Sequence, residues 1–198
     1  GAADALFLLE KTGNLKTLHY GVSLDFNYIY TLENKIKVGA DVFAGVQFLG
    51  MAEEKDLVPF FIDGEAAIKF CNPNLLKNLF IRTGFNVMLA GESNKAVNTE
   101  GVEKKFYSPF VGLKLEQIAI GPVRLDIGAD WLAGHLFTDN ITMAAGASMN
   151  VEIPFAELEK VKLNLNIGAK DKIFLKKDNG LENRASLILA IGVENVIR

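Results

Sequence analysis

The sequence predicts an all-β protein, an antiparallel up-and-down transmembrane β-barrel of about eight to ten strands, with ten favoured. Apolar and polar residues alternate over long stretches, and this period of two is the repeat of a strand and not of a helix. Hydrophobic residues make up 49% of the 198 residues, yet no run reaches the about 18 apolar residues of a transmembrane helix. A barrel explains this combination because its apolar residues are spread over alternate positions of many strands.

The first long strand is expected at Leu18–Tyr30. Apolar and aromatic residues occupy every second position from Leu18 to Tyr30, and the positions between them are mostly small, polar or charged. Soluble strands usually have about 5–6 residues, so this one is roughly twice the usual length. Eight further stretches repeat the alternation: Lys35–Phe48, Pro59–Phe70, Leu79–Gly91, Phe106–Gln117, Val123–Phe137, Ile141–Ile153, Val161–Lys172 and Arg184–Val196.

The segment before the first long strand allows two structures. Residues Ala5–Glu10 are apolar but few, so residues 1–14 form either a short first strand or a segment that lies in the lumen. As a strand, this segment raises the count to ten, and an even count brings both chain ends to one side of the barrel. No shift in composition divides the chain, so residues 1–198 are expected to form one domain.

The connections between the predicted strands are of hairpin length, so the sheet is expected to be antiparallel. Charged or polar loops are expected at Met51–Val58, at Glu92–Lys105 and after Lys172, and all three lie at one end of the barrel. The connections at the other end are shorter. One of them, Pro154–Lys160, is expected to form a helical turn.

The two faces of the strands differ in a way that indicates which one looks outward. One face carries the bulky apolar residues and almost no charge, whereas the other carries the charges and most of the glycines. A soluble barrel of lipocalin type has the opposite arrangement, with its apolar residues inside. The apolar face is therefore expected to contact lipid, with aromatic side chains near the strand ends at the level of the headgroups.

The inward face predicts a charge network in the lumen, because buried charges must be paired or solvated. We assign this network to Asp25, Lys37, Asp41, Asp63, Glu65, Arg82, Lys114, Glu116, Arg124, Asp126, Asp130, Lys162, Lys170 and Arg184. Lys35, Lys69, Glu152 and Glu194 are expected to face inward as well. The whole set has equal numbers of acids and bases, which favours a closed, cross-linked interior. A narrow water channel lined by the same residues is the alternative.

Small residues mark two further features. Inward glycines, among them Gly21, Gly112 and Gly192, either let the strands bend or leave room in the lumen. Outward alanines form a smooth wall that faces either lipid or a partner protein. These alanines are Ala40, Ala44, Ala129, Ala133, Ala145, Ala147, Ala169 and Ala185.

The sequence carries no catalytic or cofactor-binding motif. His19 and His135, the two histidines, are expected at the rim, and alternation places His135 on the apolar face while Asp130 points inward. No nucleophile elbow, phosphate loop or metal-ligand set is present, and Cys71 is the one cysteine. The formal net charge of −3 gives no basic surface for nucleic acid. We therefore expect no enzyme activity, no cofactor, no metal and no nucleic-acid partner.

The alternation over the whole chain resembles that of the small bacterial outer-membrane β-barrels, the size class of the outer-membrane protein A, X and W families. Strands such as Leu18–Tyr30 and Ile141–Ile153 carry this resemblance, and Gly121–Gly128 is similar to the phrase that opens strands in such barrels. The resemblance implies a location in the bacterial outer membrane, with the lipid bilayer as partner. It implies a structural, anchoring or interaction role. The alternatives are a narrow pore for ions or small solutes and a soluble barrel that binds an apolar ligand.

Overall fold

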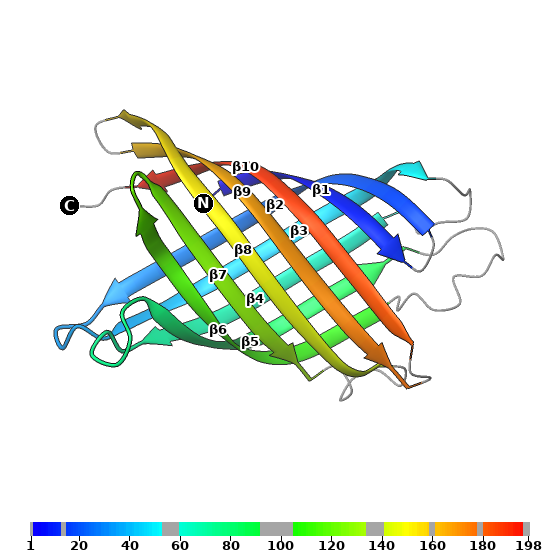
Figure 1. Cartoon of the computed structure of the whole chain (residues 1–198), viewed down its shortest axis with the longest axis horizontal. Helices are drawn as coiled ribbons and strands as arrows, with labels where there is room; N and C mark the ends of the chain where they lie inside the picture. The colour runs from blue at the N-terminus through cyan, green and yellow to red at the C-terminus, as the bar shows by residue number, and fades with distance from the viewer. Residues whose placement is uncertain are drawn as a thin grey trace.

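The computed structural model describes the backbone of residues 2–12, 15–52, 60–91, 105–133, 141–158, 161–177 and 180–195, and side chains from residue 21 onward except at 22, 49–52, 90, 182–186, 188, 194 and 195. Within these residues ten antiparallel strands form one closed barrel (Figure 1). They are β1 (Ala2–Thr12), β2 (Leu15–Thr31), β3 (Lys37–Ala52), β4 (Phe60–Cys71), β5 (Leu79–Ala90), β6 (Lys105–Ile120), β7 (Val123–Leu132), β8 (Ile141–Leu158), β9 (Val161–Lys176) and β10 (Leu181–Asn195). The predicted all-β, antiparallel up-and-down barrel is confirmed.

The barrel has a turn end, formed by residues 32–36, 72–78 and 121–122, and an opposite loop end, where β3, β5 and β7 finish. The turn end lies at the left in Figure 1, and β10 ends toward it. Gly121 has a φ of 61° in the turn between β6 and β7, a conformation that glycine adopts without steric cost. No helix in the part of the chain that the structure describes is long and apolar enough to span a bilayer.

The residues before Leu18 form a strand and not a segment in the lumen. β1 pairs with β2 along Ala2–Thr12 and with β10 along Ala2–Phe7. This strand closes the sheet into a barrel, because β1 is the neighbour of both β2 and β10. The favoured count of ten strands is thereby confirmed.

The predicted helical turn at Pro154–Lys160 is wrong for the residues that the structure describes, because β8 continues to Leu158. Proline has no backbone N–H, so a strand tolerates it only where the ladder does not need that donor. β8 pairs with β7 no further than Glu152, which leaves Pro154 without a neighbour on that side. On the β9 side, a β-bulge between Pro154 and Ala156 accommodates the ring.

Three other strand boundaries differ from the prediction. β9 extends to Lys176, so the connection expected after Lys172 begins later and is short. β3 continues to Ala52 and takes in the first residues of the loop predicted at Met51–Val58. β7 ends at Leu132, and the remainder of the strand predicted to Phe137 lies mostly outside the described residues.

A β-bulge at the start of β8 reverses two predicted orientations. The register with β9 shifts between Ile141 and Met143, and the Thr142 hydroxyl donates to the Leu175 carbonyl at 3.0 Å. Ile141 is therefore buried inside the barrel and Thr142 is exposed, the reverse of the prediction. Ala133, predicted to face outward, follows the end of β7 and is also buried.

The outer face of the described strands is apolar and exposed. Leu24, Ile68 and Leu187 are among its most exposed large side chains. Ala44, Ala129, Ala145 and Ala147 are exposed as predicted, Ala40 and Ala169 are half-buried, and the side chain of Ala185 lies outside the described set. The predicted orientation of the apolar and polar faces is therefore confirmed over most of the barrel.

Candidate functional site

The barrel interior holds most of the buried polar side chains that the structure describes. At its centre, Lys69 lies between two carboxylates. Its Nζ is 2.8 Å from Asp41 Oδ1 and 2.8 Å from each carboxylate oxygen of Glu116. Lys114 Nζ approaches the same Glu116 carboxylate at 3.0 Å. The Lys69 side chain is 0% exposed and that of Glu116 is 2% exposed, so these charges are stabilised by one another and not by water.

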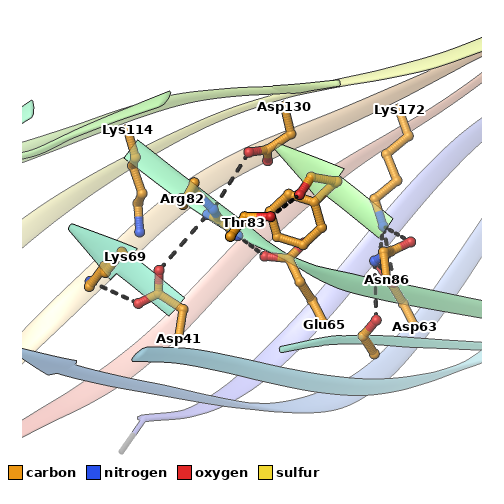
Figure 2. Close-up of polar contacts among 12 residues, drawn as sticks. Asp41, Asp63, Glu65, Lys69, Arg82, Thr83, Asn86, Lys114, Asp130 and Lys172 are labelled. Carbon is orange, nitrogen blue, oxygen red and sulfur yellow. Dashed lines mark hydrogen bonds and ion pairs between the residues drawn. The ribbon is translucent and has the colours of Figure 1, made fainter. Parts of the chain in front are cut away.

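Arg82 shares Asp41 with Lys69 and extends this arrangement to two more carboxylates (Figure 2). Its guanidinium pairs with Glu65, lies 3.5 Å from Asp130 Oδ1 through Nε, and lies 4.0 Å from Asp41 Oδ2 through Nη1. The planar guanidinium presents several donors in fixed directions, which suits a site where carboxylates converge from different strands. We call these side chains the charge network: Asp41, Glu65, Lys69, Arg82, Lys114, Glu116 and Asp130.

Aromatic rings pack against two cations of the charge network. Lys69 Nζ lies 5.1 Å from the centre of the Phe80 ring, and the Arg82 guanidinium carbon lies 4.9 Å from the centre of the Phe110 ring. The face of an aromatic ring carries partial negative charge and attracts a cation within about 6 Å. Both cations are therefore stabilised by carboxylates and by rings.

One side chain of β9 reaches across the whole lumen. β9 and β4 lie on opposite sides of the barrel, with four strands between them in either direction. Lys172 Nζ on β9 nevertheless lies 3.0 Å from both carboxylate oxygens of Asp63 on β4. The same Nζ lies 3.3 Å from the side-chain oxygen of Asn86. The side-chain nitrogen of Asn86 donates to Asp63 Oδ1 at 3.2 Å (Figure 2). These contacts hold opposite walls of the barrel together.

The inward residues on either side of Lys172 also contact distant strands. Lys170 Nζ lies 3.7 Å from the centre of the Phe43 ring on β3. The rings of Phe174 and Phe106, on β9 and β6, pack edge to face with their centres 5.1 Å apart. Three successive inward positions of β9 thus contact side chains of β3, β4 and β6.

The loop end of the lumen is filled by a buried apolar cluster. Its members come from β4, β5, β6, β7, β8 and β9: Ala67, Met88, Phe106, Phe110, Leu132, Ile141, Ala144 and Phe174. This apolar cap borders the Lys172 ion pair, since Lys172 Nζ lies 3.6 Å from Met88 Sδ. Apolar packing and the ion pairs of the lumen therefore meet at Met88.

The turn end of the lumen is polar and less buried. Arg124 Nη1 lies 3.2 Å from Glu152 Oε1, and these side chains are 31% and 26% exposed. Lys37 donates to Asn78 at 3.1 Å, and Asp126 accepts the backbone N–H of Gln117 at 2.7 Å. From the turn end to the loop end, the lumen thus passes from half-buried polar side chains to buried charges and then to the apolar cap.

Inward glycines leave space for long side chains of the charge network. A Cβ on Gly39 would lie 3.0 Å from Lys69 Cε. A Cβ on Gly112 would lie 2.8 Å from the carboxylate carbon of Asp130. Of the two roles predicted for these glycines, room in the lumen is therefore supported at these positions.

The predicted lumen network is brought together in part. The members that form ion pairs between strands are Asp41, Asp63, Glu65, Arg82, Glu116 and Asp130. Lys114 pairs with Glu116 on its own strand. Arg124 pairs with Glu152 on the adjacent strand. Asp25 and Lys162 form no ion pair with the described side chains. The side chains of Arg184 and Glu194 are not among those that the structure describes. Lys35 was placed on the inward face, but it is exposed in a turn with a φ of 67°.

Two contributions to the interior were missed from the sequence. The predicted strand ends at Lys172, although continuing the alternation by two residues from Lys170 places Lys172 inward. The inward aromatic residues were given no role, although Phe61, Phe80 and Phe110 share parity with the polar residues of their strands. The missed signal was the same alternation, applied to apolar residues on the polar face.

Comparisons of the chain with protein-family models, with curated proteins and with solved structures found no match. No group of three or more His, Cys, Asp or Glu side chains in the described part of the chain is placed to hold a metal ion. The side chains of His19 and His135 fall outside that part. The functional argument therefore rests on the geometry of the barrel and its lumen.

Proposed function

We propose that the chain is an integral β-barrel of the bacterial outer membrane, with a closed lumen and a structural, anchoring or interaction role. The observation that carries this proposal is the exposed apolar outer face around a charged interior. Monomeric soluble proteins rarely expose contiguous apolar patches larger than a few hundred Å². Lipid solvates such a face, and transmembrane barrels alternate apolar residues outward with polar residues inward.

Strand length and aromatic placement support a position across a bilayer. The described strands have 10 to 18 residues, and a tilted transmembrane strand needs about 9–11. Tyr28, Tyr30 and Phe70 are exposed on the outer face toward the turn end, and Phe48 and Phe60 are exposed toward the loop end. Rings at both ends correspond to the aromatic girdles that flank the apolar band of such barrels.

The filled interior supports an anchor over a steady pore. Ion conduction needs a continuous aqueous path, whereas Lys69, Glu116 and Phe174 are almost fully buried inside the barrel. The second candidate is a narrow pore for ions or small solutes, and the half-buried polar side chains at the turn end favour it. An interaction role for the alanine wall or the loops stays a prediction.

Reconstitution tests this proposal. We expect the protein to require detergent, to migrate faster on a gel when unheated than when heated, and to give no steady current in planar bilayers. A protein that stays monomeric and folded without detergent contradicts the membrane location. A steady current from the folded protein contradicts the closed lumen and favours the narrow pore.

A further inference from the structure

The ion pair between Lys172 and Asp63 differs from the others that the structure describes. The ion pairs of the charge network and the Arg124–Glu152 pair join residues of one strand, of adjacent strands, or of strands separated by a single strand. Lys172 and Asp63 are separated by four strands in both directions. This pair is therefore a contact across the lumen and not along its wall.

The pair lies between the apolar cap and an aromatic ring of β3. On one side lies the apolar cap, through Met88, and on the other lies the Phe43 ring, which the Lys170 ammonium group covers. Asn86 contacts both members of the pair. The Lys172 and Asp63 side chains are 14% and 20% exposed, more than those of Lys69 and Glu116. The Glu65, Lys114 and Asp130 side chains of the charge network are 19%, 18% and 16% exposed, so water reaches the pair about as readily as it reaches these three and more readily than it reaches Lys69 and Glu116.

We propose that the Lys172–Asp63 ion pair is a latch that holds the lumen closed, and that a barrel without this pair conducts ions. The proposal rests on the proposed membrane barrel and adds a gate to it. Removing one partner leaves a buried charge without its counter-ion, and such a charge recruits water. The neighbouring inward residues Lys170 and Phe174 contact the aromatic rings of Phe43 and Phe106.

Single-channel recording with Lys172→Met tests the latch. Methionine keeps most of the length of the side chain and removes the charge, so it separates an ionic latch from simple filling of space. We expect the open fraction to rise by about tenfold or more over the wild-type protein. Asp63→Asn carries the same expectation and serves if the first variant does not fold. The exchanged pair Asp63→Lys with Lys172→Asp should restore closure.

A matched control is Glu152→Gln, which removes an ion pair of similar length between adjacent strands. This variant should show no more single-channel current than the wild-type protein. Folded Lys172→Met and Asp63→Asn barrels that remain silent overturn the latch and leave the closed barrel intact. Conduction by Lys172→Ala without conduction by Lys172→Met also overturns it, because bulk and not charge would then close the lumen. Steady current from the wild-type protein overturns the proposed function instead.

Discussion

Replacing Lys69 by methionine is expected to lower the free energy of unfolding of the barrel by about 3–5 kcal/mol. The Lys69 ammonium group lies 2.8 Å from carboxylate oxygens of both Asp41 and Glu116. Without it, these two buried carboxylates lose their shared cation, and the cost of burying them is no longer offset. Denaturant unfolding of the protein reconstituted in vesicles, followed by gel migration of the folded form, measures the loss.

Two further variants serve as controls for Lys69→Met. Lys77→Met removes an exposed lysine in the turn between β4 and β5 and should change stability little. Adding Glu116→Gln to Lys69→Met removes one of the two buried carboxylates that lack a cation, and it should recover part of the lost free energy of unfolding. If Lys69→Met is no more destabilising than Lys77→Met, the charge network does not contribute to stability as argued.

Placing arginine at Leu24 is expected to destabilise the protein in a bilayer by about 2–4 kcal/mol, the cost of that residue near the membrane midplane. Leu24 is 66% exposed on the outer face of β2, well along the strand from the tyrosines at the turn end. When the barrel folds into the bilayer, the arginine side chain in this position must move from water into hydrocarbon, and this transfer costs free energy. Unfolding titrations in vesicles of fixed lipid composition measure the cost.

The control for this variant is Leu75→Arg. Leu75 is 84% exposed in the turn between β4 and β5, so it is the same residue type in an even more exposed place, outside the proposed apolar band. A membrane barrel predicts a large loss at Leu24 and little at Leu75. Equal and small effects at both positions would mean that water, and not lipid, surrounds the outer face.

The sequence was sufficient for the strand faces because burial in a barrel alternates with the pleat. Asp41, Arg82 and Asp130 were placed inward on this ground, and they meet in the charge network. A period of two says which side a residue takes, however, and not how deep it lies along the axis. It therefore could not show that Lys172 meets Asp63 across the lumen.

A β-bulge accounts for two of the orientation errors, at Ile141 and Thr142. The extra residue at Thr142 depends on how β8 meets β9, and it changes the parity of Ile141 without any change in composition. The strand through Pro154 was missed for a similar reason. Proline argues against a strand unless its missing N–H has no partner on a neighbouring strand. The pairing of β8 with β7 ends at Glu152, before Pro154, and the sequence alone does not show where this pairing ends.

The central claim, that the apolar face of the barrel contacts lipid, is tested most directly by the fluorescence of Trp131. The chain has one tryptophan, and Trp131 is 46% exposed on the outer face of β7. We measure its emission in vesicles whose lipids carry bromine on their acyl chains. Strong quenching relative to unbrominated vesicles is the predicted result. Equal emission in both kinds of vesicle, from folded and vesicle-bound protein, would contradict the claim.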